Sequence, residues 1–540
     1  MNKLPEAFRV KTTPEAIFKE YGHAKDYNMQ LGEHGLYEQV KLNERMVSGD
    51  QWHGVKAPDI DKPVLNFLKR VAYYMISMIV SDNIGVNVQL MGTDEQQSDI
   101  VGGYLGDNIS EIMEETALHS KLRRCVRDAA VDGDACIYAY WDAQNETIAV
   151  ETVANTSCLF GNPIVQTVQE QPYIIIEQAR DLRDVQMQAF HAGVAWEGIK
   201  PDAEMQERQS DAPLGAKTVT VLKKFWKDPN TGTVWFCECC ENVMLREPVD
   251  TGLTLYPIAW MNWEEVKESY HGCAIITGLI PNQIAVNRLW ASAMWYLRQQ
   301  STPKIFVDDK LLPKWSNKPG QVIAVPGGMQ GAEPATYFRA PDLSGDLPAM
   351  VEKTISLTRD FMGVNDVVLG NITPNNTSAI VAVQQSTAAP LELQRMAFYQ
   401  FVEDIVRIFC DLICTNYGER TVNSKVTAID PMTGMEVEQE QPTVIDFNAL
   451  NYRALKLRVD IGEAAYWSEL MQMQTLDNLF ASGIITDAAA YLDSIPDKYL
   501  PNKAKLIESI EKAAKQAQGQ AVVDETQDMG GMMPNAMPVM

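Results

Sequence analysis

The chain has 540 residues, of which 46% are hydrophobic and 22% charged. This composition is typical of a folded protein with several hydrophobic cores and excludes a chain that is disordered throughout. Its 71 acidic residues outnumber its 46 basic ones, giving a net charge of −25, which excludes a protein that as a whole grips nucleic acid through the phosphates. The charge either serves solubility alone or belongs to a conduit past which DNA slides without adhering.

The N-terminal part is predicted to be mainly helical. Residues 14–20 form a helical patch, and the apolar run that follows Pro63 has the spacings of three and four that predict a buried helix through residue 80. That run is too short to span a bilayer, which takes about 20 residues. Residues 84–90 alternate apolar and polar side chains and predict a half-buried strand, before a pair of helices over 98–131.

Two hairpins dominate the next part of the chain. Residues 135–141 and 146–151 predict the first. Residues 218–226 and 233–239 predict the second, across a turn of Asp, Pro, Asn and Gly at 228–232. The elements predicted between them are a strand at 173–177, a helix at 182–191 and a polar loop at 196–214.

A helical run over 278–300 is followed by a turn-rich insert. We expect Pro281 in the first helical turn, where its missing N–H costs little, and Pro303 ends the helix. Its broad apolar stripe consists of Val286, Leu289, Trp290, Ala293, Met294, Tyr296 and Leu297. The insert, 303–345, contains strand candidates at 304–307 and 321–325, and a further helix is predicted over 346–362.

The longest helix is predicted from about Asn376 to Tyr417, with a kink at Pro390. Its apolar stripe consists of Phe398, Phe401, Val402, Ile405, Ile408, Phe409, Leu412 and Ile413. Residues 422–460 are predicted to be β-rich, with a turn at 430–434. Helices are predicted over 464–518, and the Met-rich tail beyond them is expected to be disordered.

Sequence motifs of common enzymes are absent. There is no phosphate-binding G-x-x-x-x-G-K-[ST] loop, no G-x-S-x-G elbow and no H-E-x-x-H motif. The six histidines are scattered through the chain. The sequence therefore predicts no enzymatic activity and no cofactor.

Nine cysteines without an even framework, and an N-terminus without a hydrophobic leader, indicate a reducing compartment. Cys237, Cys239 and Cys240 form the one close cluster, and thiolates at such spacing can hold zinc. On a strand, however, Cys237 and Cys239 share a face while Cys240 points the other way. Packing is the favoured interpretation of this cluster, and a metal site is the alternative.

Two further polar groups have a simple and a functional interpretation. Asp132 and Asp134 flank Gly133 and predict a plain turn between a helix and a strand, with a cation-binding turn as the alternative. Lys304, Lys310, Lys314 and Lys318 give the 303–345 insert a basic bias in an acidic chain. They form either a solvated surface or a face for nucleic acid or an acidic partner.

The loop over 363–378 is rich in Gly, Asn, Pro, Thr and Ser. The side chains of its last four residues can cap the helix that follows, by accepting hydrogen bonds from its first N–H groups. Capping does not explain an uncharged loop of this length between two long helices. Neutral polar side chains would allow contact with a duplex without the strong phosphate grip of Lys or Arg.

The order of these segments resembles that of portal proteins of tailed bacteriophages. The similarity covers roughly residues 45–420 and rests on several weak matches in the same order, with no single decisive motif. They are Trp52, Lys62–Asn66, the 132–141 strand region, Leu279–Gln283 with Asn287 and Arg288, and the segment from Asn365 to Gln394.

The resemblance implies a multidomain α+β portal fold. Its expected parts are an N-terminal region and wing (1–263), a stem helix (264–302), a small α+β clip (303–345), a second stem helix (346–362), a tunnel loop (363–378), a long kinked helix with a wing β segment (379–460), a helical crown (461–518) and a disordered tail (519–540). It further implies that Asn371, Ile372, Thr373, Asn375 and Asn376 line the tunnel. The clip would present a docking surface made of Lys304, Lys310, Lys314, Trp315 and Lys318.

Such proteins assemble into a ring of about twelve subunits at one capsid vertex. The partners that the resemblance implies are double-stranded DNA passing without sequence specificity, the terminase large subunit, the major capsid and scaffolding proteins, and tail adaptor proteins, with no membrane. The expected location is the virion, with assembly in the host cytoplasm. One alternative is another virion structural or tail-adaptor protein that never encircles DNA. Another is a cysteine-dependent zinc enzyme.

Overall fold

The computed structural model describes residues 10–80, 84–90, 95–202, 217–301, 304–307, 335–338, 346–361, 391–429, 436–450, 455–461 and 476. The chain divides into two compact units, residues 1–459 and 460–540. Nearly all described residues belong to the first unit, which mixes helices and strands as the sequence predicts. None of the helices within the described ranges is both long and apolar enough to cross a membrane.

Three helices open the fold: α1 (Pro14–Gln30), α2 (Leu36–Ser48) and α3 (Phe67–Ile79). The Asn66 side chain caps α3 by accepting a hydrogen bond from the N–H of Lys69. The prediction of a buried helix is confirmed, because the apolar stripe of α3 from Leu68 to Ile79 is buried. Both α2 and α3 pack against the later helices α5 and α8.

Strand β1 (Ile84–Leu90) has the predicted bounds and pairs with β14 (Leu455–Ile461). The predicted helical pair follows as α4 (Glu95–Glu115) and α5 (Leu118–Asp132). Strand β2 (Asp134–Asp142) then lies at the centre of a three-stranded sheet, between β3 (Thr147–Val153) and β9 (Ile258–Asn262). The antiparallel pairing of β2 and β3 confirms the first hairpin.

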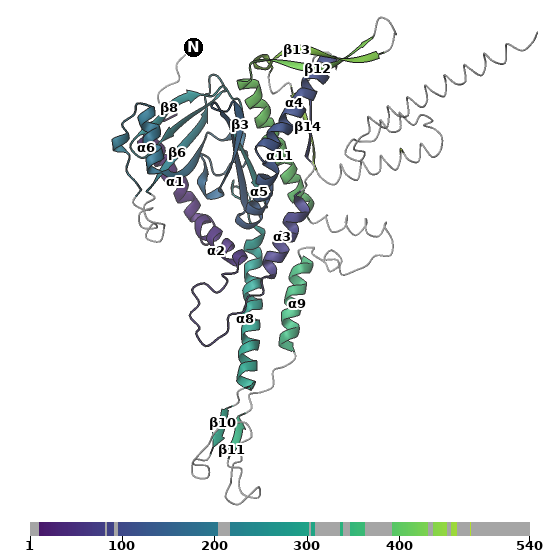
Figure 1. The fold of residues 1–540 in the computed structure, drawn as a ribbon. Coiled ribbons are helices and arrows are strands. Elements are labelled where there is room, and N and C mark those ends of the chain that lie inside the picture. Colours follow the sequence, from purple (N-terminus) through teal and green to yellow (C-terminus); the bar gives the residue numbers. More distant parts are fainter. Residues whose placement is uncertain are drawn as a thin grey trace, which may run out of the picture. The chain divides into compact units, whose positions relative to one another are not determined.

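A five-stranded antiparallel sheet forms the second β layer (Figure 1). Its strands in order are β4 (Cys158–Phe160), β5 (Tyr173–Asp181), β6 (Thr218–Lys227), β7 (Val234–Cys239) and β8 (Met244–Asp250). The pairing of β6 with β7 confirms the second hairpin, and α6 (Leu182–His191) has the predicted bounds. One hydrophobic cluster joins this sheet to α1, and another joins it to α6. Short 3₁₀ turns occur at Asn155–Ser157, Val168–Glu170 and Trp196–Gly198.

Helix α8 (Ile275–Ser301) and helix α9 (Asp346–Phe361) run side by side (Figure 1). Between them in the sequence, β10 (Lys304–Val307) confirms the strand candidate at 304–307. It pairs with β11 (Ala335–Phe338), a strand that was not predicted. The position expected for Pro281 is wrong, because this residue lies inside α8 rather than in its first turn. Burial of Ile276, Leu279 and Ile280 holds the preceding residues in the helix, although proline cannot donate to the carbonyl of Thr277.

Helix α11 (Glu392–Asn416) packs against β2 and β9. All eight residues of its predicted stripe are buried. Strands β12 (Glu419–Ile429) and β13 (Glu436–Asp446) confirm the predicted β segment, and a 3₁₀ turn follows at Phe447–Ala449. The predicted strand at 321–325, the kink at Pro390, the helices over 464–518 except for the single residue 476, and the tail over 519–540 lie outside the described residues.

Candidate functional site: the base of helix α8

The structure places only one of the predicted site residues. Lys304 is the first residue of β10 and pairs with Phe338 of β11. The remaining ones lie outside the described residues: Asn371, Ile372, Thr373, Asn375, Asn376, Lys310, Lys314, Trp315 and Lys318. What the structure does show is how the helices that flank these segments are held, and α8 is anchored by several buried polar side chains.

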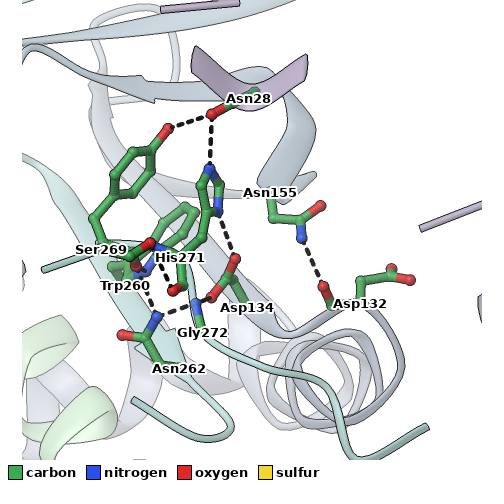
Figure 2. A network of polar contacts seen from close by, with 10 residues as sticks. Asn28, Asp132, Asp134, Asn155, Trp260, Asn262, Ser269, His271 and Gly272 are labelled. Carbon is green, nitrogen blue, oxygen red and sulfur yellow. Dashed lines mark hydrogen bonds and ion pairs between the residues drawn. The ribbon is translucent and has the colours of Figure 1, made fainter. Parts of the chain in front are cut away.

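The loop before α8 is anchored by Asp134 at the start of β2 (Figure 2). Its Oδ2 atom lies 2.7 Å from His271 Nδ1, and both side chains are fully buried. Its Oδ1 atom accepts hydrogen bonds from the N–H of Gly272 at 2.6 Å and from Asn262 Nδ2 at 2.8 Å. The other imidazole nitrogen, Nε2, lies 3.2 Å from Oδ1 of Asn28, a buried residue of α1. We call these four side chains, Asp134, His271, Asn262 and Asn28, the His271 network.

Two glycines allow the backbone to approach closely here. A Cβ atom on Gly272 would lie 2.7 Å from the carbonyl oxygen of Glu264, and one on Gly133 would lie 3.0 Å from that of Gly272. Gly133 also has φ of +102°, a value that favours glycine. The interpretation of 132–134 as a turn between a helix and a strand is confirmed. Asp134 anchors the loop, which the sequence did not indicate.

The network does not form a nucleophile–base arrangement. Ser269 Oγ bonds to the backbone of His271, donating to its carbonyl and accepting from its N–H. Both nitrogens of the imidazole face Asp134 and Asn28, so the ring has no free position for a serine hydroxyl. This is the pattern of a buried structural network in which each ring nitrogen is satisfied.

A second network holds α8 within the two turns that follow Pro281. The Gln283 side chain is fully buried, and its Nε2 atom donates to the carbonyl of Leu65 at 2.7 Å and to Asn287 Oδ1 at 3.0 Å. Its Oε1 atom accepts from the N–H of Leu68 at 3.2 Å. Outside α8, these hydrogen bonds therefore reach Leu65, just before α3, and Leu68, in the first turn of α3.

The loop between α2 and α3 completes this network. Asn287 Nδ2 donates to Gln51 Oε1 at 2.6 Å, and Gln51 Nε2 donates to the carbonyl of Met46 at 2.9 Å. Asn66 Nδ2 bonds to the carbonyl of Val47 at 3.0 Å. We call Gln51, Asn66, Gln283 and Asn287 the amide network.

Before Pro281, helix α8 has a separate polar contact. Asn43 of α2 donates from Nδ2 to Thr277 Oγ1 at 3.1 Å and to the carbonyl of Val131 at 2.7 Å. Just after Pro281, Asn282 Nδ2 donates to Thr358 Oγ1 of α9 at 3.2 Å. Three segments that carry the resemblance, 62–66, 279–288 and 132–141, therefore meet around the base of α8.

Large apolar side chains remain exposed along α8 and α9. Leu297 is 57% and Trp295 44% exposed on α8, while Met350 is 56% and Leu357 45% exposed on α9. Large apolar side chains exposed in this way are typical of surface that another protein covers, although Trp295 and Leu297, two positions apart, point to different sides of α8. We call Trp295, Leu297, Met350 and Leu357 the stem patch.

Helix α11 is fixed by a buried carboxylate. Asp411 accepts hydrogen bonds from the N–H of Thr254 at 2.8 Å, the hydroxyl of Thr254 at 3.0 Å and the N–H of Leu255 at 2.9 Å. Burial raises the pKa of Asp411, and these hydrogen bonds oppose the rise. The contact ties α11 to the connection between β8 and β9.

The cysteines of β7 pack as their alternation predicts. Cys237 and Cys239 lie in the hydrophobic cluster under α1, and Cys240 lies in the one under α6. Burial raises the pKa of both Cys237 and Cys240 to about 12, so these thiols stay protonated at neutral pH. Among the residues that the structure describes, no group of three or more His, Cys, Asp or Glu side chains could hold a metal ion.

Sequence reasoning missed the role of His271, since a single histidine among scattered ones carries no signal of its partners. Gln283 and Asn287 were noticed only as part of a resemblance. Nothing local indicated that their amides would be buried, because their partners Leu65 and Gln51 are more than 200 residues away in the chain.

Comparison with known proteins gives one family match. A family model described as "Phage P22-like portal protein" matches residues 117–538, more than three quarters of the chain. No curated protein sequence is significantly similar. The match continues well beyond residue 420, where the expected similarity ended, and it does not include 45–116. Gln51 and Asn66 of the amide network therefore lie before the matched region.

Proposed function

Because the chain belongs to the family of P22-like phage portal proteins, we propose that its copies form a ring at one capsid vertex of a tailed phage. Genomic DNA would pass through the centre of this ring during packaging and ejection, and the tail would attach to it. The family is structural rather than enzymatic, and its members are virion proteins. The observation that carries the proposal is this family match over most of the chain.

We assign the parts of the chain as the resemblance implies. Helices α8 and α9 would form the stem, the segment between them, 303–345, the clip, and residues 1–263 mostly the wing. The 363–378 segment would be the tunnel loop, and 461–518 the crown. The side-by-side course of α8 and α9, with the β10–β11 pair between them in the sequence, supports this assignment.

Exposed apolar side chains support assembly with further copies of the chain, and the resemblance implies a ring of about twelve. The stem patch leaves Trp295 and Leu297 of α8 and Met350 and Leu357 of α9 uncovered in one copy. Packing of neighbouring copies would bury this surface and remove it from water.

The charge of the chain supports passage of DNA without tight binding. With a net charge of −25, the protein as a whole repels the phosphates. The neutral loop residues Asn371, Ile372, Thr373, Asn375 and Asn376 would contact the duplex without sequence specificity.

Deletion of 365–377 is expected to leave ring assembly intact and to impair packaging or retention of DNA. Equal genome filling by the wild type and the deletion would refute this role.

We assign the docking of other phage proteins to the clip. Lys304, Lys310, Lys314, Trp315 and Lys318 would contact the terminase large subunit during packaging and tail adaptor proteins afterwards. Capsid and scaffolding proteins would contact the ring at the vertex. The ring would form in the host cytoplasm before it becomes part of the virion.

Electron microscopy of the purified protein tests the central proposal. Class averages are expected to show closed rings with a central hole. A protein that stays monomeric at high concentration under every salt condition would overturn the proposal and favour a virion or tail-adaptor protein that does not encircle DNA.

A further inference from the structure

We propose that Gln283 and Asn287 are positioning residues that set the direction of α8 and thereby the number of copies at which the ring closes. This inference rests on the proposed ring. The hydrogen-bond partners of Gln283 and Asn287 outside α8 lie in the chain's own segment from Met46 to Leu68, which lies before the region matched by the portal family. The stem direction would thus depend on a part of the chain outside that match.

Helix α8 has a weak point in its own hydrogen-bond ladder. Pro281 has no N–H group for the carbonyl of Thr277, so the helix lacks one hydrogen bond two turns after its start. Missing ladder bonds at proline are a common cause of helix bending. The direction of the part beyond Pro281 therefore depends on contacts with the rest of the protein.

Those contacts are polar on both sides of Pro281. Asn43 holds Thr277 before it, whereas Gln283 and Asn287 hold the helix after it. Apolar contacts are non-directional, but hydrogen bonds have narrow limits on distance and angle. A fully buried glutamine with two hydrogen bonds to another segment, at Leu65 and Leu68, fixes the rotation of α8 more strictly than a leucine of similar volume would.

The direction of α8 bears on the ring because α8 carries half of the stem patch. In a closed ring, the angle between neighbouring copies is the full circle divided by their number. Going from twelve to thirteen copies changes this angle by only roughly 2°. A small change in the direction in which α8 presents Trp295 and Leu297 would therefore alter the number of copies that fit.

The test compares three variants of the full chain by native mass spectrometry of assembled rings. Gln283→Met keeps the length of the side chain and removes its hydrogen bonds, and Gln51→Met removes the partner of Asn287 without changing α8. Val286→Ala is the matched control, because Val286 is fully buried on the same helix but belongs to no polar network. Melting temperatures are measured for all three.

The wild type is expected to give one dominant number of copies. Gln283→Met and Gln51→Met are expected to spread over at least two neighbouring numbers, while Val286→Ala melts at a lower temperature but keeps the wild-type number. Folded monomers of both methionine variants that no longer close rings, when Val286→Ala still closes them, would also support the inference. A single wild-type number in either methionine variant would overturn it. Absence of rings in the wild type would instead refute the proposed function.

Discussion

Carboxylates near the end of α5 differ in how well they are paired. Arg127 Nη1 lies 2.7 Å from Glu44 and 3.0 Å from Asp128, and Asp134 has partners on both of its oxygens. Asp132 Oδ1, in contrast, is buried without a hydrogen-bond partner among the described residues. Burial, together with the negative charges of Glu44 and Asp128, raises the pKa of Asp132 to about 7.

This raised pKa makes folding stability depend on pH. The contribution of Asp132 is fully present below its unfolded pKa of about 4 and is lost as the pH rises through about 7, because ionising the buried carboxyl costs free energy. The side chain that Asp132→Asn introduces carries no charge at any pH. We expect it to raise the free energy of unfolding at pH 8 by about 1–3 kcal/mol and to have little effect at pH 4.

Urea unfolding at the two pH values measures this difference. Asp142→Asn is the control, because hydrogen bonds from Gln144 and Asn145 lower the pKa of Asp142. A lowered pKa stabilises the fold at high pH, so this variant should gain nothing at pH 8. An equal gain by Asp132→Asn at both pH values would contradict the explanation.

At the scale of elements, α1 is joined to the five-stranded sheet by a buried lysine. Lys224 of β6 is fully buried, and its Nζ atom contacts Glu20 Oε2 of α1 at 2.5 Å and the carbonyl of Lys11 at 2.9 Å. Glu20 remains 25% exposed. The two partners of this ion pair are therefore not equivalent, since water reaches only one of them.

We expect Glu20→Ala to destabilise the protein more than Lys224→Met. Removing Glu20 leaves an ammonium group buried without its counter-charge, at a cost of about 2–4 kcal/mol, whereas Lys224→Met leaves a carboxylate that water can solvate. Chemical denaturation measures both costs, and limited proteolysis reports whether α1 has detached. A larger loss for Lys224→Met would show that packing of the lysine stem, rather than charge, dominates.

At the scale of the whole molecule, the described part of one copy leaves hydrophobic surface that its own fold does not cover. The exposed members of the stem patch lie on helices whose neighbouring faces are buried, such as Ala291 and Ala293 on α8 and Val351 on α9. Burial of this patch against other copies would stabilise the assembly without affecting the fold of one copy.

Substitutions in the stem patch should therefore separate assembly from folding. We expect Leu297→Ser and Leu357→Ser to leave the melting temperature of the monomer nearly unchanged and to raise the concentration needed for ring formation by about tenfold each. Analytical ultracentrifugation measures that concentration. Val249→Ser on β8 is the control, with a side chain of comparable exposure outside the patch. An equal effect of all three would argue against a specific role of the patch.

Features that depend on neighbours in the sequence were predicted well. The two hairpins follow from turn residues, the helix α6 and the strand β1 from periodicity, and the packing of Cys237, Cys239 and Cys240 on opposite faces from strand alternation. Each of these signals is local, because backbone geometry repeats every two residues in a strand and every 3.6 in a helix.

Other features depend on residues that meet only in the folded chain. Pro281 lies inside α8 because distant segments bury the preceding turn, which overrides the tendency of proline to begin a helix. The partner of β1 is the distant strand β14, and Gln283 contacts Leu68 across 215 positions of sequence. The sequence by itself determined the local elements and the family resemblance. Only the tertiary structure decided that buried hydrogen bonds converge on the base of α8, because no local pattern encodes which distant partner satisfies a buried amide or imidazole.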